Sequence, residues 1–375
     1  MKAHKFMRIV QDLNQKGCCH PQTLGSGGIV INKQEGFRIY EYVLFAGATF
    51  LAFVLCVSVG SVSVPLKDTM TIIWNSVWGI PVPETIETPS IILSVRLPRV
   101  ICVALTGASL SLCGGAMQGL LRNPLADGST LGVSSGAALG AVIAIAFGIT
   151  MPSLPFAGTM IMAIVFAFIS LIVILTLAYK MDFSLSTNTI ILIGVIYSMF
   201  VSSVLSLIIT FAPDRVKHIT FWTMGSLSGS SFDNALVLLA ALAIFGGVIV
   251  LHARELNAFA IGEENARNIG VNVKRVKIFI MISVSGLIGV CVSIGGTIGF
   301  IGLVTPHIVR MITGPNHKRL LPASLLGGAT FLMLADLIAR ILFNPLELPI
   351  GVVTSFIGAI LFVYIFYTSR RKAHA

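Results

Sequence analysis

Residues 96–140 read RLPRVICVALTGASLSLCGGAMQGLLRNPLADGSTLGVSSGAALG, and they decide the fold of this chain. An apolar run of helix length begins behind two arginines, ends at the polar NPLAD turn and leads into a second apolar run. Glycines recur at four-residue spacing, which lets helix backbones approach closely in lipid. The stretch therefore predicts tightly packed membrane helices. The packing glycines that we assign are Gly115, Gly119, Gly132, Gly136 and Gly140.

The composition extends this prediction to the whole chain. Hydrophobic residues make up 55% of it and charged residues only 11%. Soluble domains carry about 25% charged residues, so most of this chain must face lipid or other apolar helices. We expect one polytopic membrane domain, residues 39–375, preceded by a polar cytoplasmic tail, residues 1–38.

Ten apolar runs are long enough, or nearly so, to cross a membrane, and the expected fold class is all-α with about ten transmembrane helices. The runs fall at about 39–64, 97–121, 131–150, 158–179, 188–212, 235–252, 276–296, 298–313, 320–338 and 350–369. The eighth run is short and contains Gly299, Gly302 and Pro306. We expect irregular backbone there, buried in the bundle where freed polar groups find other partners.

The distribution of basic residues sets the orientation. With the N-terminus inside, the cytoplasmic side receives nineteen of the 25 lysines and arginines, including those of the 253–277 loop, and the outer side receives six. Cytoplasmic loops of membrane proteins carry such an excess. Both termini are therefore expected in the cytoplasm. The formal charge of +10 follows from this bias and from anionic lipid, and it gives no reason to expect nucleic-acid binding.

Three of the six outer basic residues stand out. Arg96 and Arg99 flank Leu97-Pro98 at the start of the second run, and Arg340 lies at the outer end of the ninth. Arginine binds carboxylates in bidentate geometry, so acidic residues of an external partner would fit. Two alternatives stay open from the residues alone. The guanidinium groups could reach lipid phosphates, or they could pair internally, as Arg340 could with Asp336 one turn earlier.

The 253–277 loop is the second candidate surface. Residues 261–271, IGEENARNIGV, predict a short amphipathic helix with an acidic start and a stop at Gly270. On such an exposed helix, a small residue like Ala266 lets a groove of a partner come close. The alternative is an ordinary solvated loop. The pattern Glu264-x-Ala266-x-x-x-Gly270 is similar to the segment by which permeases of ATP-binding-cassette (ABC) importers contact their ATPase subunits.

Several absences limit the function. The chain has no GxxxxGK[ST] phosphate loop, so we expect a transport subunit without an ATPase site of its own. The apolar runs contain no HExxH or paired Glu/His ligand pattern, and we expect neither a bound metal nor a cofactor. Acids within the apolar runs are almost absent, although ion-coupled carriers usually need them. An ion-coupled secondary carrier is kept as the alternative from a different class.

The motifs in their order along the chain resemble the FecCD-type permeases, the membrane subunits of ABC importers for iron-siderophores, haem and vitamin B12. The matching segments are RLPR at 96–99, QGLLRNPLAD at 118–127, LGVSSGAALGA at 131–141, LST at 185–187, FWTMGSLSG at 221–229, IGEENARNIGV at 261–271, GTIGFIGLVTPHIVR at 296–310, LADLIAR at 334–340 and LPIGVV at 348–353. They cover about three quarters of the chain. The N-terminal 38 residues depart from the pattern because they are longer.

The resemblance implies a multi-pass permease of a bacterial plasma membrane and its partners. These are two ATPase subunits on the cytoplasmic side, an external substrate-binding protein, and a second permease subunit in a homo- or heterodimer. It also implies that Arg96, Arg99 and Arg340 meet glutamates of the binding protein. The segment assigned to ATPase coupling comprises Gly262, Glu263, Glu264, Ala266 and Gly270. An iron-siderophore is the leading substrate, with vitamin B12 or haem as alternatives within the class.

The cytoplasmic gate is our own inference from the topology. Asn123 and Leu125 in the NPLAD turn, and Ser186 and Thr187 before the fifth run, fall at cytoplasmic helix ends. Small polar or apolar residues there can close a path without binding a hydrated ion. By analogy with the family, the fifth and tenth helices would line that path. Their apolar, methionine- and serine-bearing faces suit a large chelate held weakly, since transport requires entry without tight retention.

Overall fold

The structure, a computed structural model, describes residues 39–60, 64–81, 89–128, 131–149 and 157–373. The polar tail that we predicted to be cytoplasmic, residues 1–38, lies outside the described residues.

The expected all-α fold is confirmed. Over the described residues the secondary structure is helical, and ten apolar segments correspond to the ten expected runs. These are α2 (Ile39–Ser58), η1 with α4 (Ile91–Arg96 and Leu97–Leu120), α5 (Val133–Ala146), α6 (Ala157–Met181), α7 (Thr187–Phe211), α9 with η3 and α10 (Phe232–Ala241, Leu242–Gly246 and Gly247–Leu251), α13 (Val273–Gly295), α14 (Ile301–Thr313), α15 (His317–Ile341) and α16 (Ile350–Ala373). Six of the described helices are long and apolar enough to cross a membrane, and four others are apolar but shorter.

Short helices connect these segments. They are α3 (Leu66–Trp78), η2 (Pro213–Arg215), α8 (Val216–Thr223), α11 (Ala253–Ala260) and α12 (Glu263–Asn268). We did not expect α3, because its polar residues interrupt the apolar pattern that marks a membrane span.

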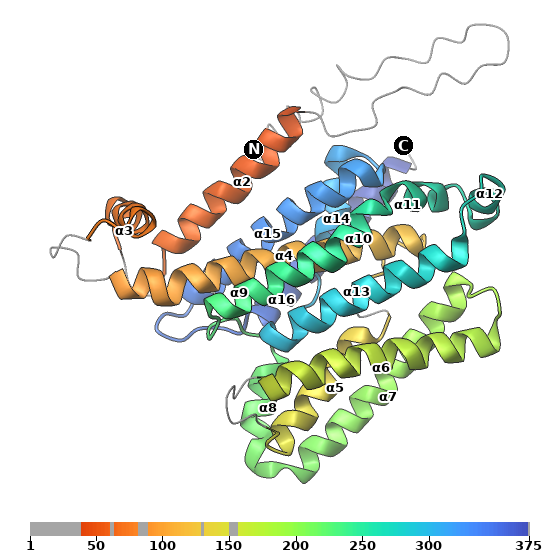
Figure 1. Ribbon diagram of the computed structural model, residues 1–375, viewed down its shortest axis with the longest axis horizontal. Coiled ribbons are helices and arrows are strands. Elements are labelled where there is room, and N and C mark those ends of the chain that lie inside the picture. Colours follow the sequence, from red (N-terminus) through yellow and green to blue (C-terminus); the bar gives the residue numbers. More distant parts are fainter. Residues whose placement is uncertain (1–38, 61–63, 82–88, 129–130, 150–156, 374–375) are drawn as a thin grey trace, which may run out of the picture.

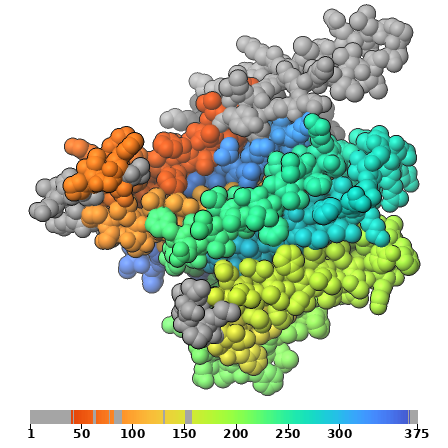
Figure 2. All heavy atoms as spheres, in the orientation of Figure 1, coloured from red at the N-terminus to blue at the C-terminus, as the bar shows by residue number. Residues whose placement is uncertain are grey.

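The helices form one bundle around α4 and α13, which are more buried than the other helices long enough to cross a membrane (Figure 1). On one side, α15 and α14 pack against α4, and α2 packs against α15. On the other side, α5, α6 and α7 pack against one another. Within this group, α5 and α6 contact α13. Figure 2 shows the side chains of α6 and α13 meeting along a continuous seam.

The assigned glycines lie where helices approach each other. A Cβ atom on Gly136 would overlap Ser170, and one on Gly140 would overlap the backbone of Met162, so both let α5 lie close to α6. Gly119 faces the ring of His317 and Gly115 faces Leu321, which brings α4 to α15. Gly132 caps the start of α5 with a φ of +73°, which favours glycine, and a Cβ atom there would also lie 3.0 Å from the Gly194 carbonyl of α7.

Two further close approaches were not predicted. Gly107 on α4 faces the backbone of Gly328 on α15, and Gly114 on α4 faces Gly302 on α14. These backbone-to-backbone contacts are the membrane-helix packing that small residues allow. They involve glycines far apart in the chain, and a spacing rule within one helix cannot identify them.

The eighth run is more regular than we expected. α14 is an α-helix from Ile301 to Thr313 with Pro306 inside it, so the prediction of irregular backbone over these residues is wrong. Proline removes the hydrogen bond to the carbonyl four residues earlier. Here that carbonyl, of Gly302, accepts instead from Gln118 Nε2 at 3.1 Å, which allows the helix to continue. The irregular backbone lies just before the helix, at residues 296–300.

The bundle has two ends, which we name after the orientation predicted from charge. The outer end holds the C-terminal end of α2 and the N-terminal end of α4, and the inner end holds α11 and α12 (Figure 1). At the outer end Arg96 contacts Ser58, and Arg99 contacts Glu347. The first turn of α2 belongs to the inner end, because the carboxylate of Glu41 pairs there with Arg319 near the start of α15. Figure 1 also shows the C-terminal end of α16 near α11, so both ends of the described chain lie at the inner end.

Candidate functional site

A cleft of about 390 Å³ at the inner end brings two of the predicted sites together. It is lined by Arg122, Ser186, Thr187, Asn188, Gly262, Glu263, Glu264 and Asn265. Two of the four residues assigned to the gate and three of the five assigned to ATPase coupling therefore share one cleft. The other two gate residues, Asn123 and Leu125, lie in the turn that follows Arg122.

The coupling segment folds as the sequence predicts, with one correction. α12 begins with Glu263 and Glu264, whose charges favour a helix N-terminus, and ends before Gly270, whose φ is +91°. Ala266, however, is fully buried, so its methyl group does not lie on the accessible face of this helix. Its methyl group packs into the main core because α12 lies against α11 and α13. The accessible side chains of α12 are those of Glu264, Asn265, Arg267 and Asn268.

A buried lysine links α12 to the turn before α7, residues 182–187. We call this turn the gate turn because it contains the proposed gate residues Ser186 and Thr187. The side chain of Lys277 on α13 is fully buried, and its Nζ donates to Glu263 Oε1 at 2.7 Å and to the Leu185 carbonyl at 2.8 Å. Leu185 has a φ of +53°, an uncommon conformation for leucine, and directly precedes Ser186. One cation therefore holds the first turn of α12 and the turn that precedes α7 in fixed relation.

From the sequence, Lys277 was assigned only a part in the charge bias that orients the chain. A signal was present, because a lysine inside an apolar run is unusual and generally has a specific partner. The identity of that partner depends on the tertiary fold, since Leu185 lies 92 residues earlier in the chain.

The gate turn, residues 182–187, is held by its own side chains. Asp182 accepts hydrogen bonds from the backbone N–H groups of Ser184 and Ser186 and from the Ser184 hydroxyl. The hydrogen bonds from Ser184 and then those from Ser186 lower the pKa of the Asp182 carboxyl well below its usual range. The Ser186 hydroxyl lies 2.9 Å from Thr189 Oγ1 in the first turn of α7. Asp182 is therefore charged at neutral pH, and its hydrogen bonds maintain the shape of the turn.

The NPLAD turn is built in a similar way. Asn123 Oδ1 accepts from the Leu125 N–H at 2.9 Å, and the Asn123 carbonyl accepts from the Ala126 N–H at 3.1 Å. These bonds turn the chain back after α4 and leave the Leu125 side chain 45% exposed. Leu125 is thus an accessible apolar side chain at the inner end, beside the cleft-lining Arg122.

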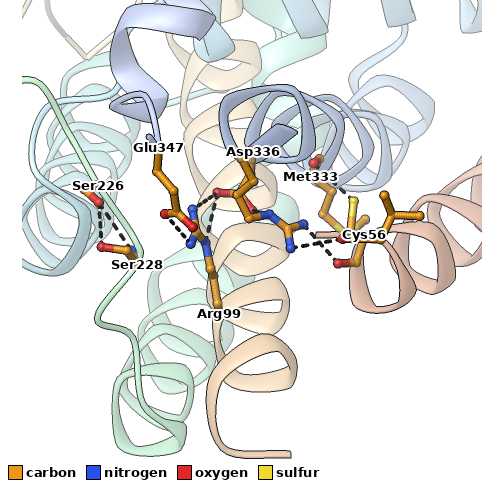
Figure 3. A network of polar contacts seen from close by, with 9 residues as sticks. Cys56, Arg99, Ser226, Ser228, Met333, Asp336 and Glu347 are labelled. Carbon is orange, nitrogen blue, oxygen red and sulfur yellow. Dashed lines mark hydrogen bonds and ion pairs between the residues drawn. The ribbon is translucent and has the colours of Figure 1, made fainter. Parts of the chain in front are cut away.

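The outer arginines lie inside the protein. Arg96, Arg99 and Arg340 are only 3–6% exposed. Arg99 donates to Asp336 Oδ1 at 2.9 Å and to Glu347 Oε2 at 2.8 Å (Figure 3). Arg340 lies 3.0 Å from the other carboxylate oxygen of Asp336. The internal pair that the sequence left open as an alternative is therefore present.

These arginines also join α2 to the rest of the bundle. Arg96 Nη1 donates to the carbonyls of Val57 and Ser58, and Arg340 donates to those of Cys56 and Val59. The carbonyls at the end of a helix lack partners within it, and the two guanidinium groups satisfy them. The side chain of Glu347 is 38% exposed, so the surface of this network is formed by an acid.

Known proteins match this chain over most of its length. The sequence profile of the FecCD transport family matches residues 48–368. The uncharacterized ABC transporter permease protein YvrB of Bacillus subtilis is 39% identical over 89% of this chain and 95% of its own length. The cobalamin import system permease protein BtuC of Halobacterium salinarum is 35% identical, covering 92% of this chain and 90% of that protein. A solved structure described as an inward-facing conformation of a putative metal-chelate type ABC transporter aligns with a TM-score of 0.77 at 30% identity, over 88% of this chain and 100% of that one.

Proposed function

The chain belongs to the FecCD transport family and is a permease subunit of an ABC importer of the metal-chelate, vitamin B12 or haem type, and we propose that it carries an iron-siderophore complex into the cytoplasm. ATP is hydrolysed by a separate ATPase subunit in this family. The proposed location is a bacterial plasma membrane, with a second permease subunit completing the path.

The observation that carries the proposed mechanism is the contact of Lys277 with both α12 and the gate turn. An ATPase subunit that moves α12 would pull on Glu263, and Lys277 would transmit that pull to Leu185 and the start of α7. Buried side-chain networks with few alternative arrangements can transmit such a displacement because packed interiors deform little. α7 is one of the two helices that we propose to line the path.

A weakly binding path suits a bulky chelate, and the surface of α7 supports this proposal. Its exposed side chains include Ile196, Met199, Phe200 and Leu207. The hydroxyl groups of Ser203 and Ser206 on the same helix donate to carbonyls four residues earlier, so they satisfy their own hydrogen bonds. Such a surface offers contact area with few strong donors, which allows passage without tight retention.

At the outer end we propose that the external binding protein docks over the buried arginine network. Because Arg99 is already paired, docking would require a carboxylate of the partner to replace Glu347, the exposed member of the network. Arg96 and Arg340 would act indirectly, by holding the end of α2 against α4 and α15. The docking role that the sequence suggested for all three arginines thus becomes a direct role for Arg99 alone.

The substrate is tested through the cognate external binding protein. Ferric siderophores, cobalamin and haemin are titrated into that protein, and quenching of its fluorescence reports binding. We expect the ferric siderophores to bind more tightly than the other two. Tight binding of cobalamin or haemin, with no binding of ferric siderophores, would replace the proposed substrate by one of its alternatives.

A further inference from the structure

The helix α3 exposes an apolar stripe at the outer end. Leu66, Met70, Trp74 and Trp78 lie four residues apart on one face, and they are 54%, 40%, 62% and 65% exposed. The indole rings of Trp74 and Trp78 pack together with their centroids 5.8 Å apart. We call these four residues the tryptophan face. Large side chains that are this exposed and contiguous generally mark a contact surface.

The opposite face fixes α3 to the protein. Thr69 and Ile72 are buried, and Ile73 packs against the main core. The helix ends at Gly79, whose φ is +66°, and the side chain of Asn75 donates to the Pro81 carbonyl at 3.2 Å. α3 also contacts α2 and η1. The tryptophan face is therefore held in a defined position.

The position and direction of α3 indicate what covers this face. Figure 1 shows α3 end-on while α4 and α13 are seen lengthwise, so α3 runs across the long helices at the outer end of the bundle. Figure 2 shows it beside the outer end of α2. α2 exposes Leu51 and Leu55 there, so the apolar surface of a membrane-spanning helix leads directly to α3.

We propose that α3 is an interfacial helix whose tryptophan face lies in the headgroup region of the outer leaflet. A helix that lies across the spanning helices at their ends is parallel to the membrane surface and at its boundary. Tryptophan concentrates at this depth because its ring is largely apolar and its N–H can reach water or headgroups. Lys67, on the exposed part of the first turn, can extend its ammonium group to lipid phosphates. Amphipathic helices bind bilayers in this manner.

The tryptophan content of the chain permits a direct test. The sequence contains three tryptophans, of which Trp74 and Trp78 are on α3 and Trp222 is half-buried at the end of α8. In the full chain with Trp222→Phe, the remaining tryptophan fluorescence, excited at a wavelength that tyrosine does not absorb, comes from α3 alone. A second variant, Trp74→Phe with Trp78→Phe, retains Trp222 as the matched control. Both are reconstituted into nanodiscs with phosphatidylcholine brominated at a shallow or a deep position of the acyl chain.

We expect lipid brominated at the shallow position to remove roughly half of the α3 emission, as suits indoles near headgroup depth, with less quenching by the deep position. The emission of the Trp222 control should be quenched less by the brominated lipid. Iodide in solution should quench the α3 emission only weakly. Strong quenching of α3 by iodide with none by brominated lipid would overturn the proposal, since α3 would then be in water. Protection from both quenchers in a dimeric sample would also overturn it and assign the face to a second copy of the chain.

Discussion

Lys277 is a fully buried cation that joins α12 to the turn before α7. Lys277→Met keeps the apolar stem and removes both hydrogen bonds. Removing one partner of a fully buried ion pair costs about 3–5 kcal/mol. We expect about 2 kcal/mol of lost stability, below that range because Glu263 keeps partial exposure. Transport per ATP hydrolysed should fall by about tenfold, within the usual range of coupling energies.

The matched control for this substitution is Lys274→Met, one turn earlier on α13, where the lysine is exposed and lies 4.4 Å from the centre of the Tyr179 ring. It should leave the ratio of transport to ATP hydrolysis unchanged. Both variants are measured in the complex assembled with its ATPase subunits. Normal coupling in a folded Lys277→Met protein would exclude Lys277 as the link.

Glu347 competes with a docking partner for Arg99 if our proposal for the outer end is correct. Glu347→Gln removes the competing charge and leaves Arg99 paired with Asp336. The Kd of the external binding protein should therefore decrease, by about two- to tenfold for one partly exposed ion pair. Asp233→Asn is the control, because it removes one exposed acidic charge from the same end at the start of α9. Equal tightening by both variants would indicate general electrostatics and not exchange at Arg99.

At the scale of the helix, the packing glycines make a testable distinction. A methyl group at Gly140 would overlap the backbone of Met162 on α6, whereas one at Gly47 on α2 meets no atom within 4 Å. Overpacking costs about 1–3 kcal/mol, so Gly140→Ala should lower the Tm of the purified protein. Gly47→Ala should leave the Tm unchanged or raise it, since alanine favours helix by about 1 kcal/mol. A Gly140→Ala protein as stable as the parent would disprove the close packing of α5 on α6.

The spanning helices could be predicted from the sequence because each satisfies a local requirement. A span must be apolar over the thickness of the bilayer, and ten segments of that kind are visible in one pass along the chain. α3 could not be found in this way, because it is amphipathic and 13 residues long. The residues of its apolar face recur at every fourth position. Lys67, Asp68 and Asn75 lie between them, so the sequence shows no continuous apolar run there. The regularity of α14 depends on Gln118, a residue of another helix that replaces the hydrogen bond lost at Pro306.

The candidate sites were predicted at the level of segments and not of contacts. The acidic start and the glycine stop of α12 are local features, and the structure retains both. The burial of Ala266 and the pairing of Lys277 depend on how α11, α12 and α13 pack, which a single segment does not reveal. The burial of Arg99 has the same cause, since its partner Asp336 is 237 residues further along the chain.

At the scale of the whole molecule, the predicted orientation places Ser228 outside the cell and Asn268 inside. Both side chains are exposed, at the outer and the inner end respectively. The test uses a background with Cys18→Ser and Cys19→Ser, because the sequence also has these two cysteines. The cysteines at positions 56, 102, 113 and 291 are buried, so we expect them to react slowly with maleimides. In intact cells, a membrane-impermeant maleimide should label Ser228→Cys and not Asn268→Cys. Permeabilised cells should allow both to react, and the reverse pattern in intact cells would invert the orientation.

The most direct test of the whole proposal is ATP-driven uptake in proteoliposomes. The permease is reconstituted with its ATPase subunits, ATP is enclosed with them, and the external binding protein is added outside with a radiolabelled ferric siderophore. We predict that the label accumulates with ATP, does not accumulate without it, and is indifferent to a proton or sodium gradient. Uptake that continues without ATP and follows an ion gradient would contradict the assignment as an ABC importer permease.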